Sequence, residues 1–168
     1  MELNDIVISL SLAEKLKNIG INQVSLFSYF KGINGDLKIE KNDYIQDNYK
    51  FLCSAFTSDE LFQFLPSPVL VNTNTFVVAD SYSYRKITHD EVESFPYANL
   101  DIHYEQDCIV VRYVYLGAVI AFNKTLGGLY INLISNRETL SEALSNMIYE
   151  IYSNKLTLIH FNIQEFKN

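Results

Sequence analysis

Residues 139–154 carry the most regular pattern of hydrophobic and polar positions in the chain. Thr139 and Glu142 have the S/T-x-x-E spacing of a capping box, in which each side chain satisfies a free backbone amide at a helix start. The apolar residues that follow recur at i, i+3, i+4, i+7 and i+8, which places them on one helical face. They are Leu140, Ala143, Leu144, Met147, Ile148, Ile151 and Tyr152. The pattern predicts an amphipathic helix whose apolar face covers a sheet.

The same start signal occurs at three earlier positions. The pairs are Ser11 with Glu14, Thr57 with Glu60, and Thr88 with Glu91. Gly20 is suited to the left-handed residue after a helix, and Pro66 cannot continue one. We therefore expect helices over residues 11–19 and 58–65, and a short helical turn over residues 88–94.

Most of the remaining segments are short, apolar and rich in β-branched or aromatic residues, which is typical of strands. The expected strands cover residues 23–30, 37–40, 51–56, 69–71, 75–79, 80–85, 108–116, 118–122, 129–134 and 156–163. Asn34-Gly35 predicts a tight hairpin turn with two positive-φ residues. Asn72-Thr73-Asn74 predicts a turn that pairs the strand before it with the strand after it.

These elements indicate an α+β fold. The strands follow one another at hairpin-length intervals, and no βαβ rhythm or internal repeat is present. A length of 168 residues suits one core, so we expect a single domain over residues 1–168. We expect a mostly antiparallel sheet, covered by the C-terminal amphipathic helix and two shorter helices.

Composition and charge narrow the classes of partner. The net charge of −7 and the absence of a basic cluster argue against binding to a nucleic-acid backbone, which depends on clustered Lys and Arg. No apolar run approaches the roughly 20 residues of a membrane-spanning helix, so no membrane role is expected. Acidic residues stand where a secretory signal needs basic ones, so a cytoplasmic location is expected. Cys53 and Cys108, each in an apolar run, are interpreted as buried free thiols.

Motifs that carry catalytic chemistry are scarce. No histidine has a His or Cys partner at metal-ligand spacing, no G-x-S-x-G elbow occurs, and Gly127-Gly128 lacks the Lys and Ser or Thr of a phosphate loop. His103 and Glu105 would share one face of a strand with Asp101 and Asp107, which makes them the best candidate for a metal or acid–base centre. The solvated edge of a sheet explains the same pattern. We therefore expect no cofactor and no metal, and the enzyme class is the least favoured.

Aromatic and basic residues suggest a ligand-binding surface. The candidate residues are Tyr82, Tyr84, Arg85, Arg112 and Tyr113. Tyrosine rings and guanidinium groups can stack on a nucleotide base or another planar molecule. The alternative is that these tyrosines are half-buried packing residues of strands.

Negative charge is concentrated between Ile87 and Val111, where no Lys or Arg occurs. The acidic residues of this interval are Asp90, Glu91, Glu93, Asp101, Glu105 and Asp107. Such an interval can imitate a phosphate backbone and occupy a nucleic-acid-binding partner. It can equally form an ordinary solubilising face.

Three segments resemble a group of uncharacterised proteins encoded by phages and prophages of gut Bacteroidetes. Residues 55–66, AFTSDELFQFLP, are similar to the group's (A/S)-(Y/F)-T-x-x-E-L-x-x-x-L-P segment. Residues 139–149, TLSEALSNMIY, followed by Asn154-Lys155-Leu156, resemble its (P/S)-A-D-A-(L/M)-A-x-M-L-I-(W/Y)-L-x-x-x-x-L ending, and residues 11–25 resemble its opening. The resemblance covers about a third of the chain. It implies a small protein of the bacterial host cytoplasm and supplies no catalytic residues.

We therefore expect a non-enzymatic accessory protein of phage or prophage origin that acts through a protein partner or self-association, for example in host interaction or anti-defence. The alternative is a small-molecule or nucleotide-binding protein that uses the Tyr/Arg surface. A metal- or carboxylate-dependent enzyme centred on His103 is the third hypothesis.

Overall fold

The computed structural model describes residues 3, 6–44, 48–80, 83–123, 130–132, 134–154 and 159–160. The helices within these residues are α1 (Leu10–Asn18), α2 (Ser58–Phe62), α3 (His89–Ser94) and α4 (Leu140–Ser153). The strands are β1 (Phe27–Gly32), β2 (Leu37–Lys41), β3 (Tyr49–Ser54), β4 (Val69–Leu70), β5 (Phe76–Asp80), β6 (Ser83–Lys86), β7 (Tyr97–Glu105), β8 (Cys108–Tyr115), β9 (Ala118–Asn123), β10 (Tyr130–Asn132), β11 (Ile134–Arg137) and β12 (Ile159–His160). All strand pairs are antiparallel, so the α+β class is confirmed.

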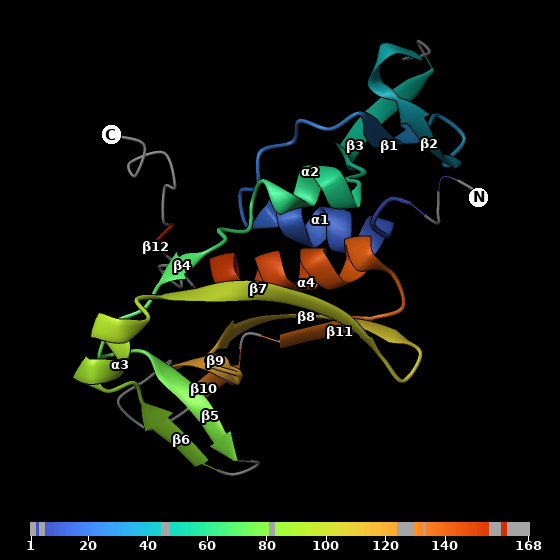
Figure 1. The fold of residues 1–168 in the computed structure, drawn as a ribbon. Coiled ribbons are helices and arrows are strands. Elements are labelled where there is room, and N and C mark those ends of the chain that lie inside the picture. Colours follow the sequence, from blue (N-terminus) through green and yellow to red (C-terminus); the bar gives the residue numbers. More distant parts are fainter. Residues whose placement is uncertain are drawn as a thin grey trace, which may run out of the picture.

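Helix α4 lies at the centre of the fold, between two layers. Its residues contact β8 and β11 on one side and α1 and α2 on the other (Figure 1). The predicted apolar face is buried or partly buried apart from Tyr152, which is 43% exposed. Ser141 and Ser145 are buried as well, and the Ser145 hydroxyl donates to the Ser141 carbonyl at 2.7 Å. These two small side chains, with their polar groups satisfied within the helix, explain how α4 is covered on more than its apolar face.

The strands form two sheets rather than one. The larger has the order β12-β4-β7-β8-β9-β5-β6, with β11 also paired to β8 and β10 to β9. The smaller has the order β2-β1-β3 and lies at the opposite end of the molecule from β5 and β6 (Figure 1). Helices α1, α2 and α4 lie between the small sheet and strands β7 and β8 (Figure 1).

One expected strand pairing is wrong. Strand β4 pairs with β7 and β12 instead of β5, while β5 pairs with β6 and β9. The Thr75 amide donates to the Asn72 carbonyl at 2.8 Å, so the expected turn does form. The Val71 amide, however, donates to the Pro96 carbonyl at 3.0 Å, which extends the pairing of β4 with β7. The turn therefore leads the chain from one part of the sheet to another. Strand β12 confirms an edge strand within residues 156–163, of which only 159–160 are described.

The small sheet contains two local features that the sequence pattern did not predict. The turn between β1 and β2 has four residues, and only Gly35 of the Asn-Gly pair has a positive φ, at 86°. In β3, Cys53 lies opposite Tyr29 and Phe51 lies opposite Phe30, so Leu52 between them forms a β-bulge. The ammonium of Lys17 in α1 donates a hydrogen bond to the carbonyl of this bulged residue.

The helix starts confirm three of the four expected caps. Thr57 with Glu60 and Thr88 with Glu91 form complete capping boxes. At the start of α4 only half of the expected box is found among the described contacts, because the Thr139 hydroxyl accepts from the Glu142 amide at 3.3 Å without the return bond from the Glu142 side chain. The fourth prediction is wrong, because α1 begins at Leu10 after Ser9, which makes no side-chain cap. Ser11 and Glu14 therefore lie inside that helix. Gly20 follows it with φ +88°, as expected.

Glu60 also joins α2 to the segment that precedes β1. Besides its cap on Thr57, its carboxylate accepts from the Ser25 hydroxyl at 3.0 Å and from the Leu26 amide at 2.6 Å. The Ser25 hydroxyl also lies 3.2 Å from the Ala55 carbonyl, just before the helix. One carboxylate thereby fixes α2 against the start of the small sheet.

Most of the buried apolar residues form one continuous cluster that includes side chains of both sheets and of α1, α2 and α4. Phe27, Tyr29 and Cys53 contribute from the small sheet, and Val111, Tyr113 and Tyr115 contribute from β8. Cys53 is buried as expected, whereas Cys108 is only partly buried, and both are free thiols. Among the described residues, no helix is long and apolar enough to span a membrane.

Candidate functional site

The structure does not bring the predicted Tyr/Arg residues into one surface. Tyr82 lies outside the described residues. Tyr84 and Arg85 belong to β6, and Arg112 and Tyr113 belong to β8, with β9 and β5 between these two strands. The strand registers place Tyr84 and Arg112 on one face of the sheet and Arg85 and Tyr113 on the other. The expected stacking surface is therefore corrected to two separate pairs.

Tyr113 is a core residue. Its side chain is fully buried, and its hydroxyl donates to the Pro66 carbonyl at 2.5 Å. Burial raises the pKa of this hydroxyl, because the ring lies where a phenolate would be poorly solvated. The bond joins β8 to the segment after α2. Tyr113 therefore cannot stack on a ligand without leaving the core.

Arg85 has a structural partner. Its guanidinium forms two hydrogen bonds with the Glu91 carboxylate, Nη1 to Oε2 at 2.9 Å and Nη2 to Oε1 at 2.8 Å. This contact is the main reason that the pKa of Glu91 falls to about 2, and the bond from the Thr88 amide lowers it further. The buried hydroxyl of Tyr115 lies near this ion pair and makes no hydrogen bond to the described residues. The Arg85–Glu91 pair holds β6 against α3.

A row of charged side chains lies on the face of β7 and β8 that carries Arg112. Asp101, His103 and Glu105 alternate along β7, as the sequence predicts, while Asp107 lies in the following turn. Asp101 Oδ2 is 2.8 Å from Arg112 Nε and 3.1 Å from His103 Nδ1. The other ring nitrogen of His103 is 3.5 Å from Glu105 Oε2.

This row holds an imidazole between two carboxylates. Such an arrangement orients a histidine and can exchange protons with it. Among the described residues, however, no group of three His, Cys, Asp or Glu side chains is placed to hold a metal ion. In the same part of the chain, no hydroxyl, thiol or amine is hydrogen-bonded to His103 as a nucleophile would be.

The same contacts account for much of the acidic interval between Ile87 and Val111. Glu91 and Asp101 are paired with arginines that lie outside the interval or at its end, and Glu93 and Glu105 lie next to histidines. Two of these four carboxylates therefore form ion pairs with arginines, and the other two each lie beside an imidazole. Imitation of a phosphate backbone by this interval stays a prediction, and these local contacts explain the position of the four carboxylates without it.

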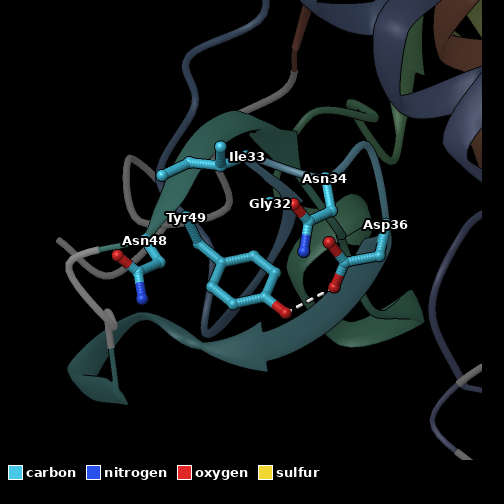
Figure 2. Close-up of a pocket in the computed structure, with 6 residues that line it drawn as sticks. All are labelled: Gly32, Ile33, Asn34, Asp36, Asn48 and Tyr49. Carbon is cyan, nitrogen blue, oxygen red and sulfur yellow. Dashed lines mark hydrogen bonds between the residues drawn. The ribbon is translucent and has the colours of Figure 1, made fainter.

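An open pocket lies at the end of the small sheet, where β1 turns into β2 and β3 begins (Figure 2). Its volume is about 550 Å³. The lining residues are Gly32, Ile33, Asn34, Asp36, Asn48 and Tyr49. Figure 2 shows the Tyr49 ring extending across the pocket, with its hydroxyl donating to Asp36. The lining thus combines an aromatic ring with amide and carboxylate groups, which suits recognition of a small polar molecule.

Gly32 makes this arrangement possible. A Cβ atom at this position would lie 2.1 Å from Asp36 Oδ1 and 3.0 Å from Tyr49 Cε1. The Lys38 ammonium lies 4.6 Å from the centre of the Tyr49 ring, and its hydrogen bond with this tyrosine raises the pKa of Lys38. The sequence pattern identified the glycine only as part of a turn. The pocket was missed because Tyr49 reaches Asp36 through the register of β3, which the pattern does not reveal.

Exposed apolar side chains surround the same end of the molecule. Ile33 is 84% exposed, Leu37 53% and Phe51 39%. Val24 and Leu26, in the segment that leads into β1, are also exposed. Phe51 packs edge-on against Phe30, with ring centres 6.2 Å apart, and Lys17 lies over its ring at 5.5 Å. The small sheet thus presents more apolar surface than its own folding uses.

Comparison of the chain with protein families, curated proteins and solved structures finds no match.

Proposed function

We propose that the protein is a non-enzymatic binding protein that recognises a protein partner through the small sheet β2-β1-β3. The observation that carries this proposal is the group of exposed apolar side chains around that sheet, with Ile33 the most exposed. Apolar side chains that folding leaves in water are stabilised when a partner covers them.

The proposal includes an origin and a setting. The resemblance of residues 55–66 and 139–149 to phage and prophage proteins of gut Bacteroidetes supports an accessory role in the cytoplasm of the bacterial host. Host interaction or anti-defence are roles in which a small protein acts by occupying another protein. The acidic composition agrees with a partner other than a nucleic-acid backbone.

A pull-down with matched variants tests the proposal. Tagged wild-type protein is exposed to lysate of a gut Bacteroidetes host and is expected to recover a stoichiometric protein. Ile33→Asp is expected to lose that protein, because it places a charge in the proposed contact. Leu116→Asp is the control, since Leu116 is also an exposed aliphatic residue, at 54%, but lies in the turn between β8 and β9. Repeated empty pull-downs, or recovery that Ile33→Asp leaves unchanged, would count against the proposal.

The pocket in Figure 2 supports a second candidate function, the binding of a small polar molecule. The ligand would make hydrogen bonds with Asp36, Asn34 and Asn48 while it packs against Tyr49. This candidate replaces the Tyr/Arg surface as the location of a ligand site.

A thermal-shift panel of nucleotides and metabolites tests the second candidate. A ligand that binds the folded state raises the melting temperature. Asp36→Ala is expected to abolish the shift, and Arg112→Ala is expected to leave it unchanged. The reverse result would place the ligand near Arg112 instead.

A further inference from the structure

The outer edge of strand β2 is a second feature with a defined binding chemistry. The order β2-β1-β3 places β2 at one side of the small sheet (Figure 1). Among the described residues, β2 pairs with β1 alone. An unpaired strand edge exposes backbone donors and acceptors that another strand can satisfy.

The hydrogen-bond pattern shows which backbone groups face outward. The Gly32 amide donates to the Asp36 carbonyl at 2.9 Å, and the Asn42 amide donates to the Leu26 carbonyl at 3.2 Å. In an antiparallel ladder, hydrogen-bonded residues alternate with residues whose amide and carbonyl point away from the neighbouring strand. The residues of β2 that point away from β1 are therefore Leu37, Ile39 and Lys41.

We propose that β2 pairs antiparallel with β2 of a second copy of this chain, about a two-fold axis at Ile39. The two copies of Ile39 would form one hydrogen-bonded pair, and each Leu37 would form another with Lys41 of the second copy. Two three-stranded sheets would thereby join into one sheet of six strands. A two-fold axis requires the interface of one copy to be complementary to the same interface of the other. Strand β2 meets this condition, because its outward-pointing backbone groups pair with themselves about Ile39.

The charged residues of β2 favour a second copy of this chain, and not an unrelated strand, as the pairing partner. The sequence Lys38-Ile39-Glu40 carries opposite charges on either side of the proposed axis. In the antiparallel pair, Lys38 therefore lies directly opposite Glu40 of the second copy, and the same contact repeats across the axis. Both positions fall in non-hydrogen-bonded pairs, where side chains of neighbouring strands lie closest. Lysine at a strand edge commonly prevents pairing, but here each lysine meets a glutamate.

The neighbouring side chains are compatible with this pairing. Lys38 and Glu40 lie on the same face as Phe30, while Ile39 lies on the face of Tyr29 and is partly buried against the core. Lys38 already lies over the Tyr49 ring of its own chain, and Asp36 lies near the same ammonium. To reach Glu40 of the second copy, the exposed Lys38 side chain would turn from Tyr49 towards the free edge of β2, and no buried residue would have to move.

A charge-swap series tests the proposal by sedimentation equilibrium, at chain concentrations up to about 1 mM, because a five-residue strand buries less than a standard interface. Wild type is expected to dimerise. Lys38→Glu and Glu40→Lys are each expected to weaken the dimer about tenfold or more, since each places like charges opposite one another. The double variant Lys38→Glu/Glu40→Lys is expected to dimerise again.

Mixing the two single variants provides the sharpest result. A chain with two glutamates at these positions and a chain with two lysines are expected to form a heterodimer, although each alone is weakened. Circular dichroism of each variant checks that the hairpin is folded. A wild type that stays monomeric, or single variants that dimerise as well as wild type, would overturn the proposal.

A backbone test is independent of charge. Leu37→Pro removes an amide that points away from β1, so the hairpin is retained while each chain loses one intermolecular hydrogen bond, two in the dimer. It is expected to weaken the dimer relative to Leu37→Ala, and equal dimerisation of the two variants would contradict the register. The inference does not rest on the proposed partner: Ile33→Asp, which lies outside β2, tests that partner separately.

Discussion

The two cysteines differ in how far their thiols reach solvent. Cys53 lies in the core, where burial is the main reason that its pKa rises to about 11. Nearby Glu14 raises this pKa further, and Lys17 lowers it. Cys108 is partly buried at the start of β8, where its thiol donates to the Glu105 carbonyl at 2.9 Å. Because the thiolate is the reactive form, the two residues should differ in rate.

We expect a maleimide to label the Cys108 thiol of the folded protein quickly and the Cys53 thiol only when the protein unfolds. Mass spectrometry after timed labelling at neutral pH measures this. Cys108→Ser should remove the fast reaction, and Cys53→Ser should leave it unchanged. Fast labelling of the Cys108→Ser variant would mean that the core around Cys53 opens readily.

Acid should weaken the Arg85–Glu91 contact in a defined pH range. The pKa of Glu91 is about 2 in the folded state, below its ordinary value of 4.5. A lowered pKa means that the carboxylate stabilises the fold above its ordinary pKa and that this contribution is lost as the pH falls from about 4.5 towards about 2. Urea unfolding of wild type and Glu91→Gln should therefore differ at pH 6, and the difference should shrink as the pH falls and disappear only below about pH 2. In an Arg85→Gln background, the pH-dependent difference should shrink, and persistence of the full difference would assign it to another partner.

At the scale of elements, Glu60 does more than cap its helix. Removal of its carboxylate leaves the Thr57 and Leu26 amides without their partner and releases the segment before β1 from α2. We expect Glu60→Ala to lower the free energy of unfolding by roughly 1–3 kcal/mol. Asp59→Ala, at the neighbouring exposed position, is the matched control and should have a much smaller effect. Chemical denaturation measures the free energy of unfolding of both variants. Equal effects would mean that Glu60 stabilises the protein only as a negative charge in the first turn of α2, and not through its hydrogen bonds.

Helix α4 makes a different prediction because its role is packing. Met147 is almost fully buried at the centre of the helix, between the sheet and the other helices. Met147→Ala should cost about 2–5 kcal/mol, as large-to-small changes in tight cores do. Tyr152→Ala, on the predicted apolar face but 43% exposed, should cost clearly less. A similar loss of unfolding free energy in both variants would indicate that Tyr152 contributes more to packing than its exposed fraction suggests.

The helices could be predicted from the sequence because their signals are local. Thr57, Thr88 and Thr139 each lie three residues before the glutamate whose amide they cap, and the apolar spacing of α4 needs no distant partner. Strand pairing is not local in this way. The partner of β4 is decided by Pro96 and β7, which lie far along the chain from Val71. The positions of the predicted site residues could not be foreseen for the same reason, since the face on which Tyr113 lies depends on sheet order and register.

At the scale of the whole molecule, the two sheets share one core. The cluster of buried side chains runs from Tyr29 and Cys53 through the helices to Val111 and Tyr115. Elements that share a continuous core unfold cooperatively in most small proteins. The small sheet is therefore expected to lose its structure together with the large one.

Two tryptophan reporters test this cooperativity, because the chain has no tryptophan of its own. Phe51→Trp reports on the small sheet and Tyr104→Trp on β7, and both positions are partly or largely exposed. Urea unfolding followed by fluorescence should give the same midpoint for each reporter as circular dichroism gives for the same variant. An earlier transition at position 51 alone would show that the small sheet opens independently.

The bulged residue Leu52 also determines whether the pocket in Figure 2 exists. With an uninterrupted ladder, Lys50 would lie opposite Gly32, and Tyr49 would point to the other side of the sheet, away from Asp36. Tyr49 thus lies opposite Gly32 because the extra residue is accommodated as a bulge and does not shift the register of the residues before it. A single additional residue, anchored by a lysine of the first helix, sets the chemistry of a surface several residues away.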